Sequence, residues 1–227
     1  MSQKSLQTSR GFASGVAAAV LFAAVLPANL GGQPHPVPRT HAQALASCLY
    51  TLASFAEWPS DAFADENAPF ILGILGEDPF GEDPDIVQRN IEIKEGEPPM
   101  AAVLRHLEVR LTVKVKSGDA KFITRKLVIK HFLSLQEDLT GCHLLFIGKS
   151  EEKRVSEDLK AVEKFSVLTV AEIDRFIDRN GILDILWKKT TDLHDKPAFE
   201  INFAAAKRSR LKLDPALSSL TKRIIKA

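Results

Sequence analysis

The segment Gly148-Lys149-Ser150 is the part of the sequence most similar to a nucleotide-binding motif. It follows an apolar run that is typical of a buried strand, and it precedes a stretch with helical periodicity. A phosphate-binding loop also needs a glycine five residues before the glycine of this tripeptide, in an open loop. His143 occupies that position inside the apolar run, where backbone amides belong to the sheet. The tripeptide is therefore interpreted as the end of a strand followed by a helix cap.

The two cysteines, Cys48 and Cys142, are the candidates for thiol chemistry. Cys142 is adjacent to His143, but neighbours on a strand point to opposite faces of a sheet, so they cannot form a thiolate–imidazole pair. No C-x-x-C motif supports a catalytic thiol. Two interpretations stay open: both cysteines are small buried hydrophobic residues, or Cys48 and Cys142 form a disulfide between a helix and the sheet.

The six histidines lack the spacing of a metal site. The sequence has no H-E-x-x-H motif, and no group of carboxylates accompanies the histidines at metal-ligand intervals. It has neither G-x-S-x-G nor G-x-G-x-x-G, and the pair Asp83 and Asp85 is interpreted as solvated charge in a loop. We therefore expect no catalytic site, no metal and no cofactor.

The composition excludes several classes of protein. The chain has 227 residues, with 30 Lys and Arg against 29 Asp and Glu. This balance excludes a strongly basic nucleic-acid-binding protein and an acidic tail protein. Hydrophobic residues make up 45% and charged residues 26%, which argues against a mostly disordered chain.

The N-terminal region predicts export. No acidic residue precedes Glu57, and Lys4 and Arg10 lie before an apolar run from Gly11 to Leu26. A basic segment followed by about 15 apolar residues is typical of a secretory signal peptide. The run is short for a membrane span, which needs about 20 residues. We expect a periplasmic protein.

The boundaries of this region follow from its small residues and prolines. We expect a signal peptide over residues 1–28, cut near Ala28, and a Gly/Pro linker over 29–39. Ala42-Gln43-Ala44 is a second cleavage candidate. An uncleaved N-terminal anchor and a transit peptide are the alternatives.

The first part of the domain is predicted to contain a helix and a buried strand. Leu45, Leu49 and Leu52 define one buried face of a helix over Thr40 to Ala56, which Pro59 ends. The continuous apolar run Phe70 to Leu75 predicts a strand buried on both faces, followed by a turn.

Strict alternation over Leu107 to Lys116 predicts a strand. Ser117 to Ala120 turns the chain and Lys121 to Phe132 returns, which makes a β-hairpin.

The central part is expected to alternate strands and helices. Cys142 to Ile147 and Val167 to Val170 are strand candidates. Ser150 is predicted to cap the helix between them. Thr169 and Glu172 have the spacing of a capping box for a second helix, which is expected to end near Asn180-Gly181.

The C-terminal part predicts a strand pair and a last helix. The strands are Ile182 to Trp187 and Ala198 to Phe203, and Asp214-Pro215 opens the helix. The expected class is α/β: a mostly parallel sheet flanked by helices, with an added antiparallel hairpin and a C-terminal strand pair. Residues 40–227 are expected to form one domain.

Five segments resemble the YfiR family in their order and spacing, over roughly residues 45–225. They are Phe55-Ala-Glu-Trp-Pro59, Phe70-Ile-Leu-Gly-Ile-Leu-Gly-Glu-Asp-Pro-Phe80, Cys142-His-Leu-Leu-Phe-Ile-Gly-Lys-Ser-Glu151, Val167-Leu-Thr-Val170 and Phe199-Glu-Ile-Asn202. The resemblance implies a periplasmic, non-catalytic α/β domain that is usually a homodimer. It also implies a regulator that represses a membrane-bound diguanylate cyclase, lowering cyclic di-GMP and disfavouring biofilm formation.

The sequence departs from the family pattern in three places. The segment from Asp83 to Thr124 is longer and supplies the hairpin. The family relates its redox response to disulfides, and here only Cys48 and Cys142 are present. Asn180-Gly181 stands where the family has Gly-Gly.

Two functional hypotheses follow. The first is a regulator that binds a membrane-anchored signalling protein, a diguanylate cyclase or a sensor kinase, with Trp187 and Phe203 as candidate contacts. The alternative is a periplasmic small-solute-binding module, because ligands of open α/β sheets bind beyond the carboxyl ends of the strands. The rim residues there would be Gly76, Asp78, Pro79, Phe80, Gly148 and Ser150.

Overall fold

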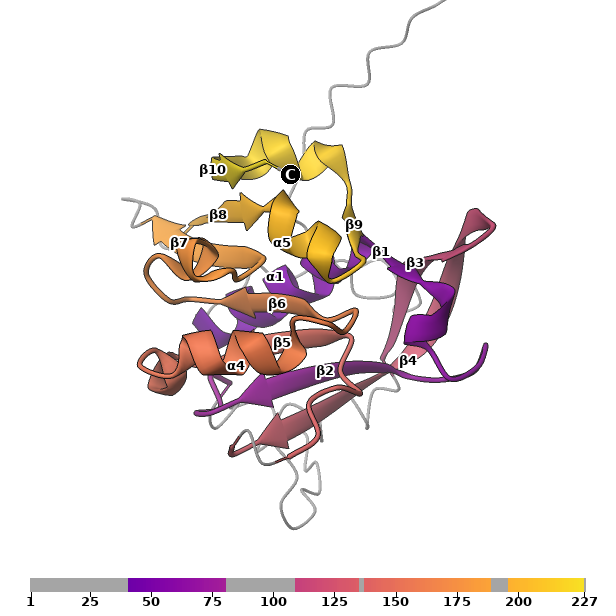
Figure 1. Cartoon of the computed structure of the whole chain (residues 1–227), viewed down its shortest axis with the longest axis horizontal. Coiled ribbons are helices and arrows are strands. Elements are labelled where there is room, and N and C mark those ends of the chain that lie inside the picture. The colour runs from indigo at the N-terminus through magenta and orange to yellow at the C-terminus, as the bar shows by residue number, and fades with distance from the viewer. Residues whose placement is uncertain (1–40, 81–108, 135–136, 189–195, 227) are drawn as a thin grey trace, which may run out of the picture.

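The computed structural model describes residues 41–80, 109–134, 137–188 and 196–226 (Figure 1). The predicted signal peptide, the linker and the pair Asp83 and Asp85 lie outside the described residues. In the part that is described, no helix is long and apolar enough to cross a membrane.

The described strands form one sheet in the order β10-β8-β7-β6-β5-β2-β4-β3-β1-β9. The pairs β1–β9, β3–β4 and β7–β8 are antiparallel, and the other neighbouring pairs are parallel. The strands are β1 Ala56–Pro59, β2 Phe70–Leu75, β3 Arg110–Ser117, β4 Asp119–Phe132, β5 Leu144–Ile147, β6 Leu168–Ala171, β7 Leu183–Lys188, β8 Lys196–Asn202, β9 Lys212–Leu213 and β10 Thr221–Ile225. This mixed α/β arrangement agrees with the expected class.

The helices are few and short. The α-helices are α1 His41–Ser54, α4 Val155–Val162 and α5 Phe203–Arg208. The 3₁₀ turns are η1 Ser60–Ala62, η2 Lys149–Glu151, η3 Phe176–Arg179 and η4 Pro215–Leu220. In Figure 1, α4 lies in front of the sheet and α1 lies behind it.

Each face of the sheet carries its own core. Strand side chains alternate between the faces, so Leu144 of β5 packs in the larger core, with α1, and Leu145 packs in the smaller core, with α4. On α4, the side chains of Val155, Leu159 and Val162 are buried. The continuous apolar runs of β2 and β5 are therefore explained by burial on both faces.

The predicted hairpin extends from this sheet through the 14-residue strand β4. The first half of β4, up to Lys126, pairs antiparallel with β3, and the second half, from Leu127, pairs parallel with β2. The β3–β4 arm thus projects from the body of the molecule (Figure 1). Gly118, at φ 74°, makes the tight turn between the strands.

Several local predictions are wrong because tertiary pairing competes with local preference. Helix α1 ends at Ser54, and the residues before Pro59 form strand β1, which pairs with β3 and β9. The predicted helix before Asn180 is only the short turn η3. The Asp214-Pro215 helix start is confirmed, since the Asp214 side chain accepts from the Ala216 N–H, but η4 is a 3₁₀ turn that leads into the unpredicted β10.

The two predicted caps are also wrong. The Ser150 hydroxyl accepts a hydrogen bond from the Glu77 N–H at 2.9 Å instead of capping a helix. Thr169 lies in β6, where its hydroxyl accepts from the Ile182 N–H at 3.1 Å. In both cases the side chain bonds a segment that is distant in sequence.

Candidate functional site

The predicted rim residues come together at the carboxyl ends of β2 and β5. The Gly148 N–H donates to the Leu75 carbonyl at 2.8 Å, and the Glu77 N–H donates to Ser150. Gly76, at φ 86°, donates its N–H to the Phe132 carbonyl at 3.0 Å. The two loops after the strands are thus joined to each other.

This rim has no room between its loops. A Cβ atom built on Gly148 would lie 2.8 Å from the Glu77 carbonyl oxygen, and one built on Gly76 would overlap the Ser150 side chain. Asp78 accepts a hydrogen bond from the Phe80 N–H at 2.9 Å, and Phe80 lies in the larger core. Pro79 is half-buried. The polar groups of the rim are thus used in hydrogen bonds within these loops and to the ends of neighbouring strands.

Trp187, a predicted partner contact, takes part in an intramolecular cluster. Its Nε1–H donates to Glu172 at 2.5 Å. His41 lies 3.1 Å from the other Glu172 carboxylate oxygen, and its ring meets the Trp187 ring edge-on at 4.7 Å. The cluster attaches the start of α1 to the ends of β6 and β7. Sequence reasoning missed His41 and Glu172 because they are 131 residues apart.

Phe203, the other predicted contact, begins α5 and packs partly buried against the larger core. The most exposed large hydrophobic residues of the described part are instead Phe122 at 72% and Leu133 at 75%. Phe122 could have been found from the alternation in the hairpin, because an aromatic residue stands there at an outward position.

Cys48 and Cys142 are both free and buried. Cys48 packs in the core on the α1 face and Cys142 in the core on the α4 face, so the sheet separates the thiols. Burial raises the pKa of each thiol to about 12. The interpretation as buried hydrophobic residues fits this structure, and the interpretation as a disulfide does not.

His143 is buried in a stack of rings on the opposite face from Cys142. Its ring stacks on Phe63 at 4.2 Å, and the Arg125 guanidinium lies 3.8 Å from the Phe63 centroid on the hairpin side. Nδ1 accepts from the Ile71 N–H at 3.0 Å, so Nε2 carries the proton toward the Ala62 carbonyl oxygen at 3.0 Å. Burial lowers the pKa of His143 to about 4. A ring held in this way is a structural element and has no free nitrogen to act as a base.

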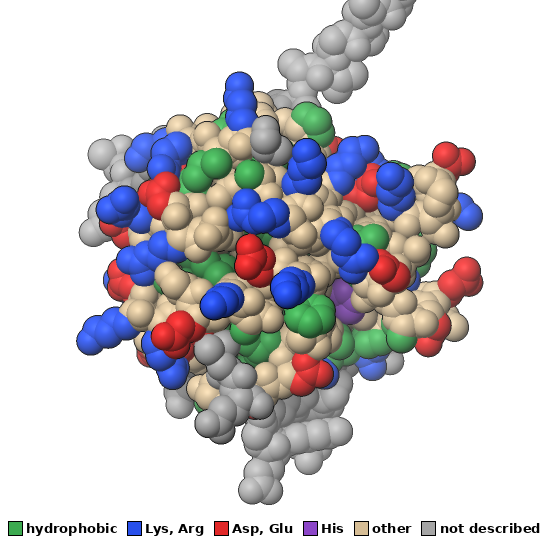
Figure 2. All heavy atoms as spheres, viewed as in Figure 1, with side chains coloured by type: hydrophobic (Ala, Val, Ile, Leu, Met, Phe, Trp, Pro, Cys, Tyr) green, Lys and Arg blue, Asp and Glu red, His purple; other side chains and the backbone are tan. Residues whose placement is uncertain are grey.

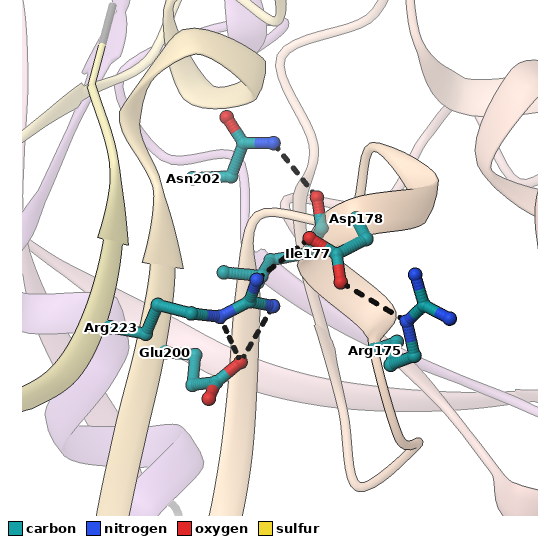
Figure 3. A network of polar contacts seen from close by, with 6 residues as sticks. All are labelled: Arg175, Ile177, Asp178, Glu200, Asn202 and Arg223. Carbon is teal, nitrogen blue, oxygen red and sulfur yellow. Dashed lines mark hydrogen bonds and ion pairs between the residues drawn. The ribbon is translucent and has the colours of Figure 1, made fainter.

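A polar network joins η3 to the C-terminal strands (Figure 3). Arg223 of β10 donates to Glu200 of β8 at 3.0 Å and to Asp178 of η3 at 2.8 Å. Asn202 donates to the Ile177 carbonyl at 3.0 Å and accepts from the Ala205 N–H, capping α5. In β8, Asn202 therefore bonds η3 directly, and Glu200 is linked to η3 through Arg223.

A cavity of about 280 Å³ lies between α4, η3 and α5. Its lining includes three basic side chains, Lys160, Arg179 and Arg208, and one acidic side chain, Glu163. Arg208 donates to Asn180 at 2.9 Å, and Arg179 donates to the Glu152 carbonyl at 2.7 Å. Figure 2 shows Lys and Arg side chains interspersed with Asp and Glu over this face of the molecule. Within the described ranges, no group of His, Cys, Asp or Glu could hold a metal ion.

Comparison with known proteins identifies the family. The YfiR/HmsC-like family model matches residues 100–222, a stretch that includes the hairpin, β5 to β9 and η4. No curated protein matches the chain. The segments Phe55 to Pro59 and Phe70 to Phe80 lie before the matched range, and β1 and β2, which they form, complete the same sheet. The chain belongs to the YfiR/HmsC-like family.

Proposed function

We propose that the chain is an exported, non-catalytic regulator that binds the periplasmic part of a membrane-anchored diguanylate cyclase and represses it. The family match over residues 100–222 carries this proposal. The geometry supports it, because the chemically versatile side chains serve the fold: His143 has both ring nitrogens bonded, and both cysteines are buried.

Repression requires that the protein bind the inactive state of its partner more tightly than the active state. A difference in affinity of about a hundredfold shifts the partner's equilibrium by about 2.7 kcal/mol. A scaffold in which loops are cross-bonded, as at Gly76 and Ser150, loses little conformational freedom on binding.

Deletion of the gene tests this proposal. We expect higher cyclic di-GMP in the deletion strain, and a return to the normal level when the protein is supplied with an export signal. The same protein supplied without residues 1–28 should stay in the cytoplasm and fail to restore repression. Unchanged cyclic di-GMP in the deletion strain would contradict the proposal.

The cavity favours a second candidate function, a small-solute-binding module. Apolar side chains form part of its wall, among them Leu159, Val162 and Ile182, and the basic side chains suit an organic anion. A thermal-shift screen with short-chain carboxylates tests this function, since a ligand of the folded state raises the melting temperature. Lys160→Gln should reduce the shift, and Lys164→Gln, on the exposed surface outside the lining, should not. Equal shifts in both variants, or none in the wild type, would exclude the cavity as the site.

A further inference from the structure

The β3–β4 arm, β1 and β9 share an outward face that we call the basic face. Strand register places Lys212, Glu57, Lys114 and Phe122 in one row across β9, β1, β3 and β4. Residues directly opposite in a sheet point to the same side, so this row shares one face. The neighbouring rows add Lys116 with Ala120, Thr112 with Thr124, and Arg110 with Lys126.

The basic face carries five basic side chains: Arg110, Lys114, Lys116, Lys126 and Lys212. Glu57 is the acid in these paired rows; it is only 5% exposed and lies 3.3 Å from Lys114. The opposite side of the same strands is apolar core, with Leu111 and Val113 buried. That side also carries Lys121 and the buried Arg125, so most of the basic side chains of the paired rows, but not all, lie on the outward side.

Phe122 stands in the same row as Lys114 and is 72% exposed. Its cross-strand neighbours on this face are Lys and Thr, which leave the ring uncovered. The hydroxyls of Thr112 and Thr124 form a cross-strand hydrogen bond at 2.9 Å in the row next to the ring. An uncovered aromatic ring among lysines is the pattern of a surface that enters a lipid interface.

We propose that the basic face docks on an anionic phospholipid bilayer, with Phe122 inserted among the headgroups. Lysines near an anionic surface each strengthen binding about fivefold, and flexible lysine stems follow mobile headgroups. The proposal is independent of cyclase repression, because vesicle binding is measured without a partner protein.

The composition of the face favours lipid over an acidic protein. Protein interfaces are depleted of lysine and have a buried apolar centre. Here four of the five basic residues are lysines, and Phe122 is the large apolar side chain of the paired rows. A bilayer needs no complementary shape, whereas a protein partner would leave these lysines to be desolvated.

Vesicle co-sedimentation tests the proposal with the protein in its exported form. We expect binding to vesicles of phosphatidylglycerol and phosphatidylcholine, no binding to phosphatidylcholine alone, and loss of binding in high salt. Lys116→Gln with Lys126→Gln should weaken binding about 25-fold. Phe122→Ser should weaken it about tenfold.

Matched variants on the α4 side provide the controls. Lys153→Gln with Lys164→Gln removes two exposed charges, and Phe165→Ser removes an exposed ring that is 41% exposed; neither should change binding. If the hairpin variants and the control variants lose vesicle binding equally, the binding depends only on the net charge of the protein, and the proposal is overturned. A second outcome would also overturn the proposal: the hairpin variants keep vesicle binding but no longer co-purify with an acidic protein. The basic face would then be a protein interface.

Discussion

The Ile71 N–H donates a hydrogen bond to Nδ1 of His143 at 3.0 Å, across the junction of β2 and β5. Because Nδ1 accepts this hydrogen bond, the ring is neutral, and its Nε2–H donates to the Ala62 carbonyl oxygen. His143, the second residue of the family-like segment Cys142 to Glu151, is therefore part of the core and also a titrating group.

Acid should destabilise the fold through His143. Its pKa is about 4 in the folded state, against an ordinary value of 6.5, so the unfolded chain takes up a proton first as the pH falls. The stability from this group is complete above pH 6.5 and is lost between pH 6.5 and 4, by about 3 kcal/mol. Urea unfolding at both pH values measures this. His143→Gln should flatten the dependence, and an equally steep dependence in this variant would contradict the assignment.

Asp184 should make the folded protein less stable as the pH rises, whereas His143 makes it less stable as the pH falls. Burial raises its pKa to about 7, aided by the charge of Glu200 opposite it on β8. The folded state then binds the proton more tightly than the unfolded state, so this contribution to stability is lost as the pH rises from about 4 to 7. Asp184→Asn should stabilise the protein by about 2 kcal/mol at pH 8 and by less than half of that at pH 5. Asp119→Asn, at an exposed position of the hairpin, is the control, and equal effects of both at pH 8 would refute the assignment.

Two features favour glycine at position 76: its positive φ and the close approach of the Ser150 side chain. Gly118 has only the positive φ, so comparing the two positions separates the two contributions to stability. Both residues have positive φ, at 86° and 74°, but only a Cβ on Gly76 meets Ser150. Gly118→Ala should cost about 1 kcal/mol of unfolding free energy and Gly76→Ala about 3 kcal/mol. Denaturant unfolding measures both, and Ser150→Gly should recover part of the Gly76→Ala loss. Equal costs would show that contact with Ser150 does not matter.

Asn202 should contribute more to the free energy of unfolding than an ordinary helix cap does. Asn202→Ala removes the cap of α5 and the bond to Ile177, and leaves a buried carbonyl unpaired. We expect a loss of about 2 kcal/mol, measured by denaturant unfolding. Asn202→Asp keeps the oxygen that caps α5 but places a second carboxylate oxygen against the Ile177 carbonyl oxygen in a buried site, so it should lose at least as much. Asp214→Ala, which removes the exposed cap of η4, should cost about 1 kcal/mol or less.

The thiols should react only on unfolding. Cys48 and Cys142 are buried, with the pKa of each raised to about 12, so alkylation of the native protein should be slow at neutral pH. Denaturation without reductant should expose two reactive thiols per chain. No reactive thiol in denatured, unreduced protein would mean that the cysteines are bridged.

The hydrophobic pattern of the sequence was sufficient to predict the elements whose side chains alternate regularly between buried and exposed, or are buried throughout. Continuous apolar runs predicted β2 and β5, strict alternation predicted β3, and Leu45, Leu49 and Leu52 predicted the buried face of α1. These patterns work because a strand or helix repeats its exposure every two or about 3.6 residues. For the two cysteines, the sequence left two interpretations open, buried thiols or a disulfide.

Only the tertiary structure decided which distant groups meet. Ser150 and Thr169 have the local signals of helix caps, yet each bonds a loop or strand far away in sequence. β1 became a strand because β3 and β9 offer it partners, although its four residues follow a helix. The row from Lys212 to Phe122 exists only through strand register. A residue's local preference is worth tenths of a kcal/mol to about 1 kcal/mol, and one buried hydrogen bond or a packed ring outweighs it.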